Sequence, residues 1–148
     1  MSSLYVKGGV AKMSGDYYSP PYEWQFDSMV QMYRSLTSNK IDLEVDFEYF
    51  EKFEGIVKVK QLLLFISDRI KLNDSAAISI SVNFVISPVF FHYSGYIRQS
   101  MARRLKNADL SANQISQIIK GVESLIKLGK TGQEFKQIHM LYLRVKAI

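Results

Sequence analysis

The C-terminal stretch, residues 87–148, constrains the fold most, because it carries its own signals for where helices begin and end. Ser111 and Gln114 have the spacing of a capping box, in which each side chain bonds the backbone amide of the other residue. Apolar residues then recur at steps of three and four, and Gly129 follows as a left-handed C-terminal glycine would. This pattern predicts a helix over 112–128.

The same stretch predicts a helix on either side of that one. A second capping box begins at Thr131 and predicts a helix over 132–146. Ser87 and Pro88 are the residue types favoured at an N-cap and a first helical position, and an apolar stripe follows them. We therefore expect a helix over 88–106, and short connections that make neighbouring helices roughly antiparallel.

The region before these helices alternates between apolar and polar residues. Residues 41–49 alternate strictly and place four acids on one side, which is typical of a half-buried strand. Residues 56–60 favour a short strand that runs into a helix. Residues 76–86 also alternate and are rich in β-branched side chains, although their serine and asparagine positions, four apart, allow a helix.

Together these patterns predict an α+β fold. An extended arm over 1–22 and a helix over 23–38 precede a small antiparallel sheet, about 41–86, and the three C-terminal helices pack on that sheet. The alternative is an all-α domain in which 76–86 is a buried helix. In either case we expect residues 23–148 to form a single globular domain.

Composition excludes several classes of protein. The chain of 148 residues has no cysteine, so it contains no disulfide, no catalytic thiol and no cysteine-bound metal. No run approaches about 20 apolar residues, so we expect no membrane span. The N-terminus lacks the apolar core of a secretion signal. These features favour a reducing, cytoplasmic location.

Charge is distributed unevenly along the chain. Residues 42–74 hold eight acidic and five basic side chains, whereas residues 91–148 hold ten basic and three acidic ones. Such a division indicates a contact steered by electrostatics, with the basic end facing an acidic partner.

The sequence contains no complete motif for catalysis, a cofactor or a metal. Gly129-Lys130-Thr131 resembles the end of a phosphate-binding loop, but Ser124 stands where that loop needs its first glycine. The alternating acids of 41–49 share one solvated face instead of opposing one another. His92 and His139 have no companion motif. We therefore expect a protein that is not an enzyme, with no cofactor and no small-molecule substrate.

Two groups of apolar and aromatic residues are candidates for partner contacts. The N-terminal arm is rich in aromatic rings, including Tyr17, Tyr18 and Trp24, which dock on the protein's own core or clasp a partner. Met140 and Leu143 form a second apolar arc on the last helix. Either that helix is enclosed within the domain, or this arc meets a partner or a second copy of the chain.

The basic residues supply the remaining candidates. Arg98, Arg103, Arg104 and Lys106 cluster near the end of the 88–106 helix, where cations also complement the helix dipole. Further cations follow at Lys120, Lys127, Lys130, Lys136, Arg144 and Lys146. Arg104 falls within the apolar arc of its helix, so it either snorkels or pairs with a buried acid.

The sequence thus predicts a protein-binding module, such as an inhibitor, an immunity-type protein or an accessory subunit of an assembly. The partner is a protein or a second copy of this chain. The alternative is a basic accessory protein that binds nucleic acid, although no recognised nucleic-acid motif is present.

Overall fold

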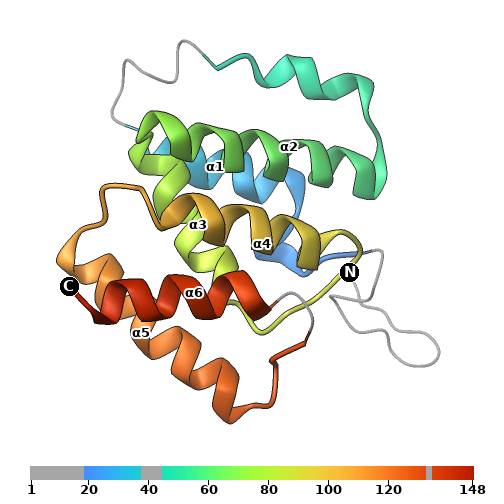
Figure 1. Ribbon diagram of the computed structural model, residues 1–148. Helices are drawn as coiled ribbons and strands as arrows, with labels where there is room; N and C mark the ends of the chain where they lie inside the picture. The colour runs from blue at the N-terminus through green and yellow to red at the C-terminus, as the bar shows by residue number, and fades with distance from the viewer. Residues whose placement is uncertain (1–18, 38–44, 133–134) are drawn as a thin grey trace.

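The protein is all-α in the residues that the structure describes. The computed structural model describes residues 19–37, 45–132 and 135–148, and none of these lies in a β-strand (Figure 1). The α-helices are α1 (Phe26–Leu36), α2 (Gly55–Arg69), α3 (Ser75–Val85), α4 (Ser94–Leu105), α5 (Ala112–Lys127) and α6 (Phe135–Lys146). Short 3-10 helices are η1 (Tyr22–Trp24), η3 (Phe47–Lys52) and η4 (Ile70–Leu72). The predicted α+β fold is therefore wrong, and the all-α alternative fits.

Helix α3 lies at the centre and contacts α1, α2, α4 and α5. It is buried on most of its surface, through Ala76, Ala77, Ile78, Ile80, Ser81, Val82, Phe84 and Val85. A helix surrounded by neighbours is apolar all round, so it lacks the polar stripe that identifies a surface helix. This explains why 76–86 resembled a strand. Ser79 and Asn83, one turn apart, are among the few less buried positions.

The predicted strand over 41–49 is also wrong for residues 45–49, which the structure describes. Residues 38–44 lie outside the described part of the chain, and Val45 and Asp46 have no regular structure. Phe47 and Phe50 are buried on one side of η3, while Glu48 and Tyr49 are exposed. The period of this segment is thus three residues, as in a 3-10 helix.

Residues 56–60, predicted as a short strand, belong to α2. Val59, Leu62, Leu63 and Ile66 are buried along one side of that helix, at the steps of three and four that α-helices use. Lys58 and Lys60, which alternate with the valines of this segment, are partly exposed beside the buried side of the helix.

The prediction for α5 is confirmed at both ends. Ser111 and Gln114 form the full capping box. Gly129 has a φ of 74°, and the N–H groups of Gly129 and Lys130 bond the carbonyls of Ile126 and Leu125. This is the Schellman arrangement that glycine permits. The second predicted capping box involves residue 134, which lies outside the described residues.

Helix α4 begins at Ser94, six residues later than predicted. Ser94 Oγ accepts the N–H of Phe91 at 2.8 Å, and the N–H of Ser94 bonds the Phe91 carbonyl, so a tight turn precedes the helix. Tyr93 adopts a φ of 73° within this turn, so it precedes α4 and is not part of a helix as the predicted range of 88–106 required. This late start is linked to Arg98, whose side chain bonds the carbonyls of Ser87 and Val89 just before the turn.

Helices α3 and α5 approach closely at Gly121. A Cβ added to Gly121 would lie 2.5 Å from Cβ of Ile86, which cannot move without its backbone. Replacing glycine by alanine inside a helix ordinarily stabilises it by about 1 kcal/mol. At this position the overlap outweighs that gain.

We therefore predict that Gly121→Ala lowers the free energy of unfolding by about 1–3 kcal/mol, as overpacking does. Urea denaturation measures the change. The control is Ser124→Ala at an exposed position of the same helix, which should leave stability within about 0.5 kcal/mol. A stabilised Gly121→Ala protein would contradict the close approach.

Candidate functional site

The first candidate from the sequence, Arg98, is a core residue. Its side chain is fully buried, donating from Nε to the carbonyl of Phe84 at 3.2 Å and from Nη2 to Ser87 and Val89 at 3.1 and 2.7 Å. Its guanidinium lies 5.0 Å from the Phe84 ring centre and 4.3 Å from that of Phe90. Arg98 thus satisfies carbonyls at and beyond the end of α3.

This role explains the late start of α4. The carbonyls of Ser87 and Val89 accept from Arg98, whereas in a helix that starts at Pro88 they would accept backbone N–H groups. A buried cation that needs acceptors outweighs the local preference of a Ser-Pro pair.

Trp24 is likewise part of the core. Its side chain is 4% exposed and its ring meets Phe84 edge-on at 4.9 Å. For this residue, the interpretation that the ring docks on the protein's own core fits the structure. Tyr17 and Tyr18 lie outside the described residues.

Arg104 is tied to the neighbouring helix. It forms an ion pair with Asp68 at 2.9 Å and donates to Ser67 Oγ at 2.8 Å, so it joins α4 to α2. The acid is not the buried one that the sequence suggested, because the Asp68 side chain is 62% exposed and the pair lies near the surface. Lys146 is paired too, since its Nζ lies 3.8 Å from Glu123.

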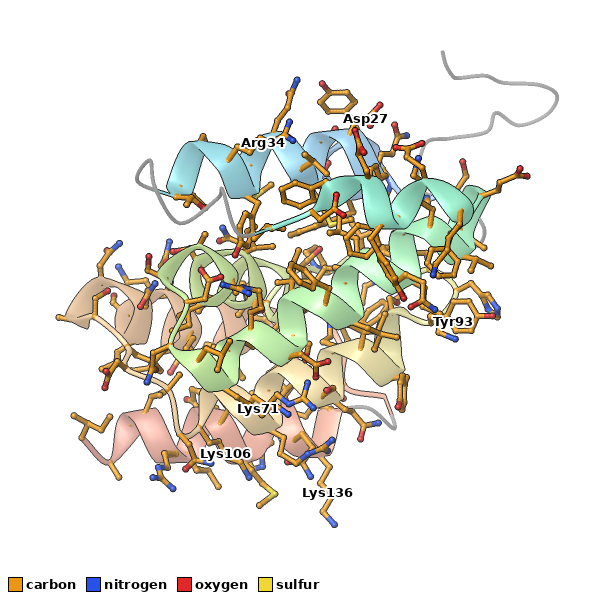
Figure 2. The ribbon with its side chains drawn as sticks, turned by 90° about the horizontal axis from the view of Figure 1, so that it is seen from above. Asp27, Arg34, Lys71, Tyr93, Lys106 and Lys136 are labelled. Carbon is orange, nitrogen blue, oxygen red and sulfur yellow. The ribbon has the colours of Figure 1, made fainter. Side chains whose placement is uncertain are left out.

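Several of the remaining cations lie on the side of the molecule formed by α4 and α6, whereas Lys120 and Lys127 belong to α5. Figure 2 shows Lys71, Lys106 and Lys136 along one side, and Asp27 and Arg34 of α1 on the opposite side. Arg103 and Arg144 are exposed on these same two helices. Within the described part of the chain, none of these five cations forms an ion pair.

Met140 and Leu143 are exposed on α6, between the exposed cations Lys136 and Arg144. Ile138, Leu141 and Val145 form the buried side of α6, which packs against α4 and α5. Met140 and Leu143 face away from it and are 42% and 54% exposed. The interpretation in which α6 is enclosed within the domain is therefore wrong.

We call this surface the basic face. It comprises Arg103, Lys106, Lys136, Met140, Leu143 and Arg144, with Lys71 at its edge. Sequence reasoning singled out four of these residues as leading candidates and named Lys136 and Arg144 among further cations. It missed Lys71, which lies more than thirty positions earlier in the chain, because only the packing of α2 against α4 brings it near Arg103.

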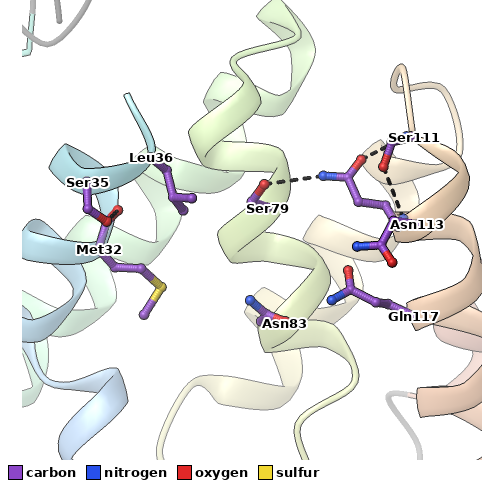
Figure 3. A pocket seen from close by; sticks show the side chains of 9 residues that line it. Met32, Ser35, Leu36, Ser79, Asn83, Ser111, Asn113 and Gln117 are labelled. Atoms are coloured by element: carbon purple, nitrogen blue, oxygen red, sulfur yellow. Dashed lines mark hydrogen bonds between the residues drawn. The ribbon is translucent and has the colours of Figure 1, made fainter. Parts of the chain in front are cut away.

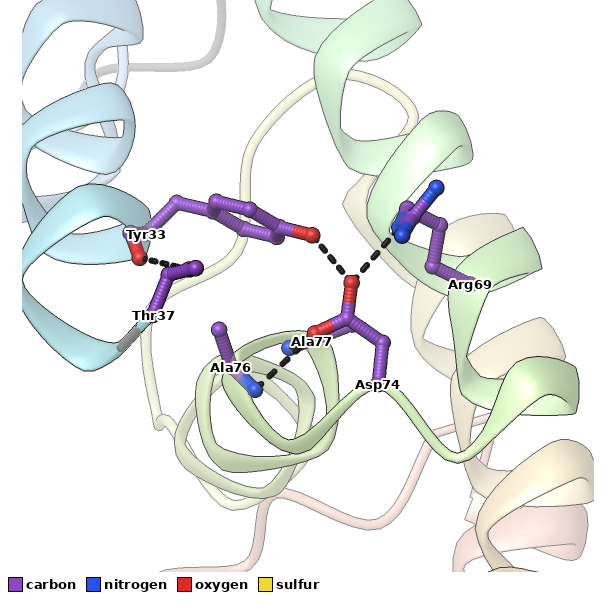
Figure 4. A network of polar contacts seen from close by, with 6 residues as sticks. All are labelled: Tyr33, Thr37, Arg69, Asp74, Ala76 and Ala77. Carbon is purple, nitrogen blue, oxygen red and sulfur yellow. Dashed lines mark hydrogen bonds and ion pairs between the residues drawn. The ribbon is translucent and has the colours of Figure 1, made fainter. Parts of the chain in front are cut away.

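A second polar cluster, around Asp74, is structural. Asp74 Oδ1 accepts the N–H groups of Ala76 and Ala77, while Oδ2 accepts from Arg69 Nε at 2.6 Å and from the Tyr33 hydroxyl (Figure 4). The carboxylate thereby caps α3 and links it to α1 and α2. All of its partners are structural groups, so no position for a reacting substrate remains.

The ionisation of this cluster is set by its hydrogen bonds. Burial works to raise the pKa of Asp74, but the bonds from Arg69, Tyr33 and the Ala77 N–H together lower it below its usual range. Burial and then the bond to Asp74 raise the pKa of the Tyr33 phenol, which therefore remains a donor. Asp74 is ionised in the folded protein throughout the neutral range.

One groove away from the basic face holds only neutral side chains. This groove of about 370 Å³ between α1, α3 and α5 is lined by hydroxyls, carboxamides and two apolar residues, without a charged group (Figure 3). Gln114 in this groove already bonds both Ser79 and Ser111. Among the described residues, no three acidic or histidine side chains converge as metal ligands.

The comparisons with known proteins add no relative. No protein-family model matches the chain, and no curated protein or solved structure is similar to it. In the described part of the chain, no helix has the length and apolar character needed to cross a membrane.

We predict that Asp74→Asn lowers the free energy of unfolding at pH 7 by about 2–3 kcal/mol, because asparagine keeps the cap but loses the charge. The lowered pKa stabilises the fold above the unfolded value of about 3.9, and this contribution is lost as pH falls through the folded value. The variant should therefore show a shallower loss of stability below about pH 4. Denaturation across pH measures this, with Asp109→Asn, an exposed acid, as the control.

We also predict that Arg98→Met lowers the free energy of unfolding by about 3 kcal/mol, because buried carbonyls lose their donor. The matched control is Arg103→Met on the exposed side of the same helix, which should change stability by no more than about 0.5 kcal/mol. Equal effects of the two substitutions in urea denaturation would contradict the division between core and surface arginines.

Proposed function

We propose that the protein is a non-enzymatic protein-binding module that docks an acidic partner protein on its basic face. Inhibitors and accessory subunits act in this way, by occupying a surface of another macromolecule. One observation carries the proposal: two apolar side chains, Met140 and Leu143, are exposed in the midst of cations that form no ion pair among the described residues.

This composition matches the anatomy of a protein interface. Interfaces place apolar side chains at the centre and polar or charged groups around them, and they are enriched in methionine and arginine. On α6, Lys136 and Arg144 flank the apolar pair, and Arg103 and Lys106 extend the charged rim on α4. A partner that fits therefore has an apolar patch bordered by aspartate or glutamate.

The charge of the whole molecule favours such an encounter. The acidic side chains Glu48, Glu51 and Glu54 belong to η3 and the residues that follow it, at the end of the molecule away from α6 (Figure 1). The molecule thus has an acidic end and a basic face. An acidic partner is steered toward the basic face, and the rate of association should fall as salt rises.

Nucleic acid is the second candidate, and one residue favours it. Tyr96 is 67% exposed and lies on the outer side of α4 near Arg103, where a base could stack on its ring. Phosphodiester backbones need no apolar contact, however, so Met140 and Leu143 are better explained by a protein.

We predict that the double substitution Met140→Asp and Leu143→Asp abolishes capture of an acidic protein from native cell extract while leaving stability nearly unchanged. Both side chains are exposed, so the folded state loses little, whereas the interface loses its apolar centre and gains repulsive charge. Affinity capture after nuclease treatment, with mass spectrometry of the bound proteins, measures the effect.

The control is Lys120→Glu with Lys127→Glu on the outer side of α5, which also makes the surface more acidic. The same protein should remain bound to this variant. Retention by the Met140→Asp, Leu143→Asp variant would overturn the proposal. Loss of all capture after nuclease, with binding that weakens steeply with salt, would establish nucleic acid instead.

A further inference from the structure

A small pocket opens at the edge of the basic face, where three parts of the chain meet. Its volume is about 290 Å³, and its lining is Ile70, Lys71, Asn73, Arg103, Arg104 and Asn107. Lys71 comes from η4, Asn73 from the turn before α3, and the remaining polar residues from the end of α4 and the turn after it.

The charged and amide groups of this lining form a set of donors. Three side chains are cationic, two carry carboxamides, and no acid lines the pocket. Arg104 is held by Asp68, which lies outside the lining, and by Ser67. Lys71 and Arg103 form no ion pair or hydrogen bond within the described residues, so their charge is available to a ligand.

These cations are not needed to satisfy the helix ends beside them. The carbonyl of Ile70 accepts the N–H of Asn73 at 2.9 Å, and the carbonyl of Arg104 accepts the N–H of Asn107 at 3.1 Å. Lysine and arginine near a helix C-terminus often serve such carbonyls. Here backbone N–H groups bond the carbonyls of Ile70 and Arg104, so the side-chain donors of Lys71 and Arg103 remain free.

Asn73 is held in place before any ligand arrives. Its backbone has a φ of 55°, a left-handed conformation that asparagine tolerates better than most residues. Its Oδ1 accepts the N–H of Asp109 at 3.0 Å. This bond fixes the carboxamide and leaves its Nδ2–H groups able to donate to a ligand. The fixed amide thus supplies one preorganised donor beside two unpaired cations.

We propose that this pocket binds a phosphate monoester, carried as a phosphorylated side chain by the acidic partner. Two unpaired cations match the two negative charges of a monoester, whereas a carboxylate or a phosphodiester carries only one. The three outer oxygens of the monoester accept from several donors at once. The proposal rests on the proposed function, because it names the chemical group that docks beside the basic face.

The test uses three acidic peptides that differ at one position, which is phosphoserine, serine or glutamate. Inorganic phosphate serves as the free source of the same group. Titration at fixed ionic strength, followed by NMR, should shift the side-chain signals of Asn73 Nδ2 and Arg103 Nε. The phosphoserine peptide should bind most tightly, glutamate more weakly and serine least.

Lys71→Gln or Arg103→Gln should weaken binding of the phosphoserine peptide about five- to tenfold, since each removes a charge-assisted contact. Lys120→Gln and Lys127→Gln are exposed controls that should leave the affinity unchanged. Equal binding of the phosphoserine and glutamate peptides, or unchanged affinity in the two pocket variants, would overturn the proposal. Docking through Met140 and Leu143 would still stand in that case, because capture of the partner measures it separately.

Discussion

The fold depends on burying one helix whose two ends must be satisfied inside the protein. Helix α3 is enclosed by four other helices, so its terminal amides and carbonyls have little access to water. Asp74 accepts the amides at its start, and Arg98 donates to carbonyls at and beyond its end. Each charged group is anchored in turn, Asp74 by Arg69 and Tyr33, and Arg98 by two aromatic rings.

This arrangement divides the charged residues of the chain into two kinds. Arg98 and Arg104 lie on the same helix as Arg103, yet they are engaged in joining helices and are poorly placed to meet a partner. Among the described residues, Arg103, Lys136 and Arg144 are exposed and form no ion pair, and they lie on the same two helices, α4 and α6, as the exposed pair Met140 and Leu143. A surface of this composition is the basis for the proposal that the protein recognises a partner.

Local signals in the sequence were sufficient where a helix lies on the surface and fixes its own ends, as at Ser111 and Gly129 of α5. They failed where distant residues decide the structure. Alternation over 76–86 indicated a strand because a helix buried on nearly every side has no polar stripe, and the start of α4 is set by Arg98. The candidate site shows the same limit: Met140 was identified from its spacing, but Lys71 joins Arg103 only through packing between helices.

The most direct test of the account places a photoreactive amino acid at position 143 on α6, and separately at position 126 on α5, which is also exposed. Irradiation in native extract, followed by mass spectrometry, identifies the cross-linked partner. The account predicts an acidic protein cross-linked from position 143 and not from position 126, with excess unlabelled protein competing for it. Absence of a competed cross-link at 143, or the same partner recovered from both positions, would contradict the assignment of the basic face as the binding surface.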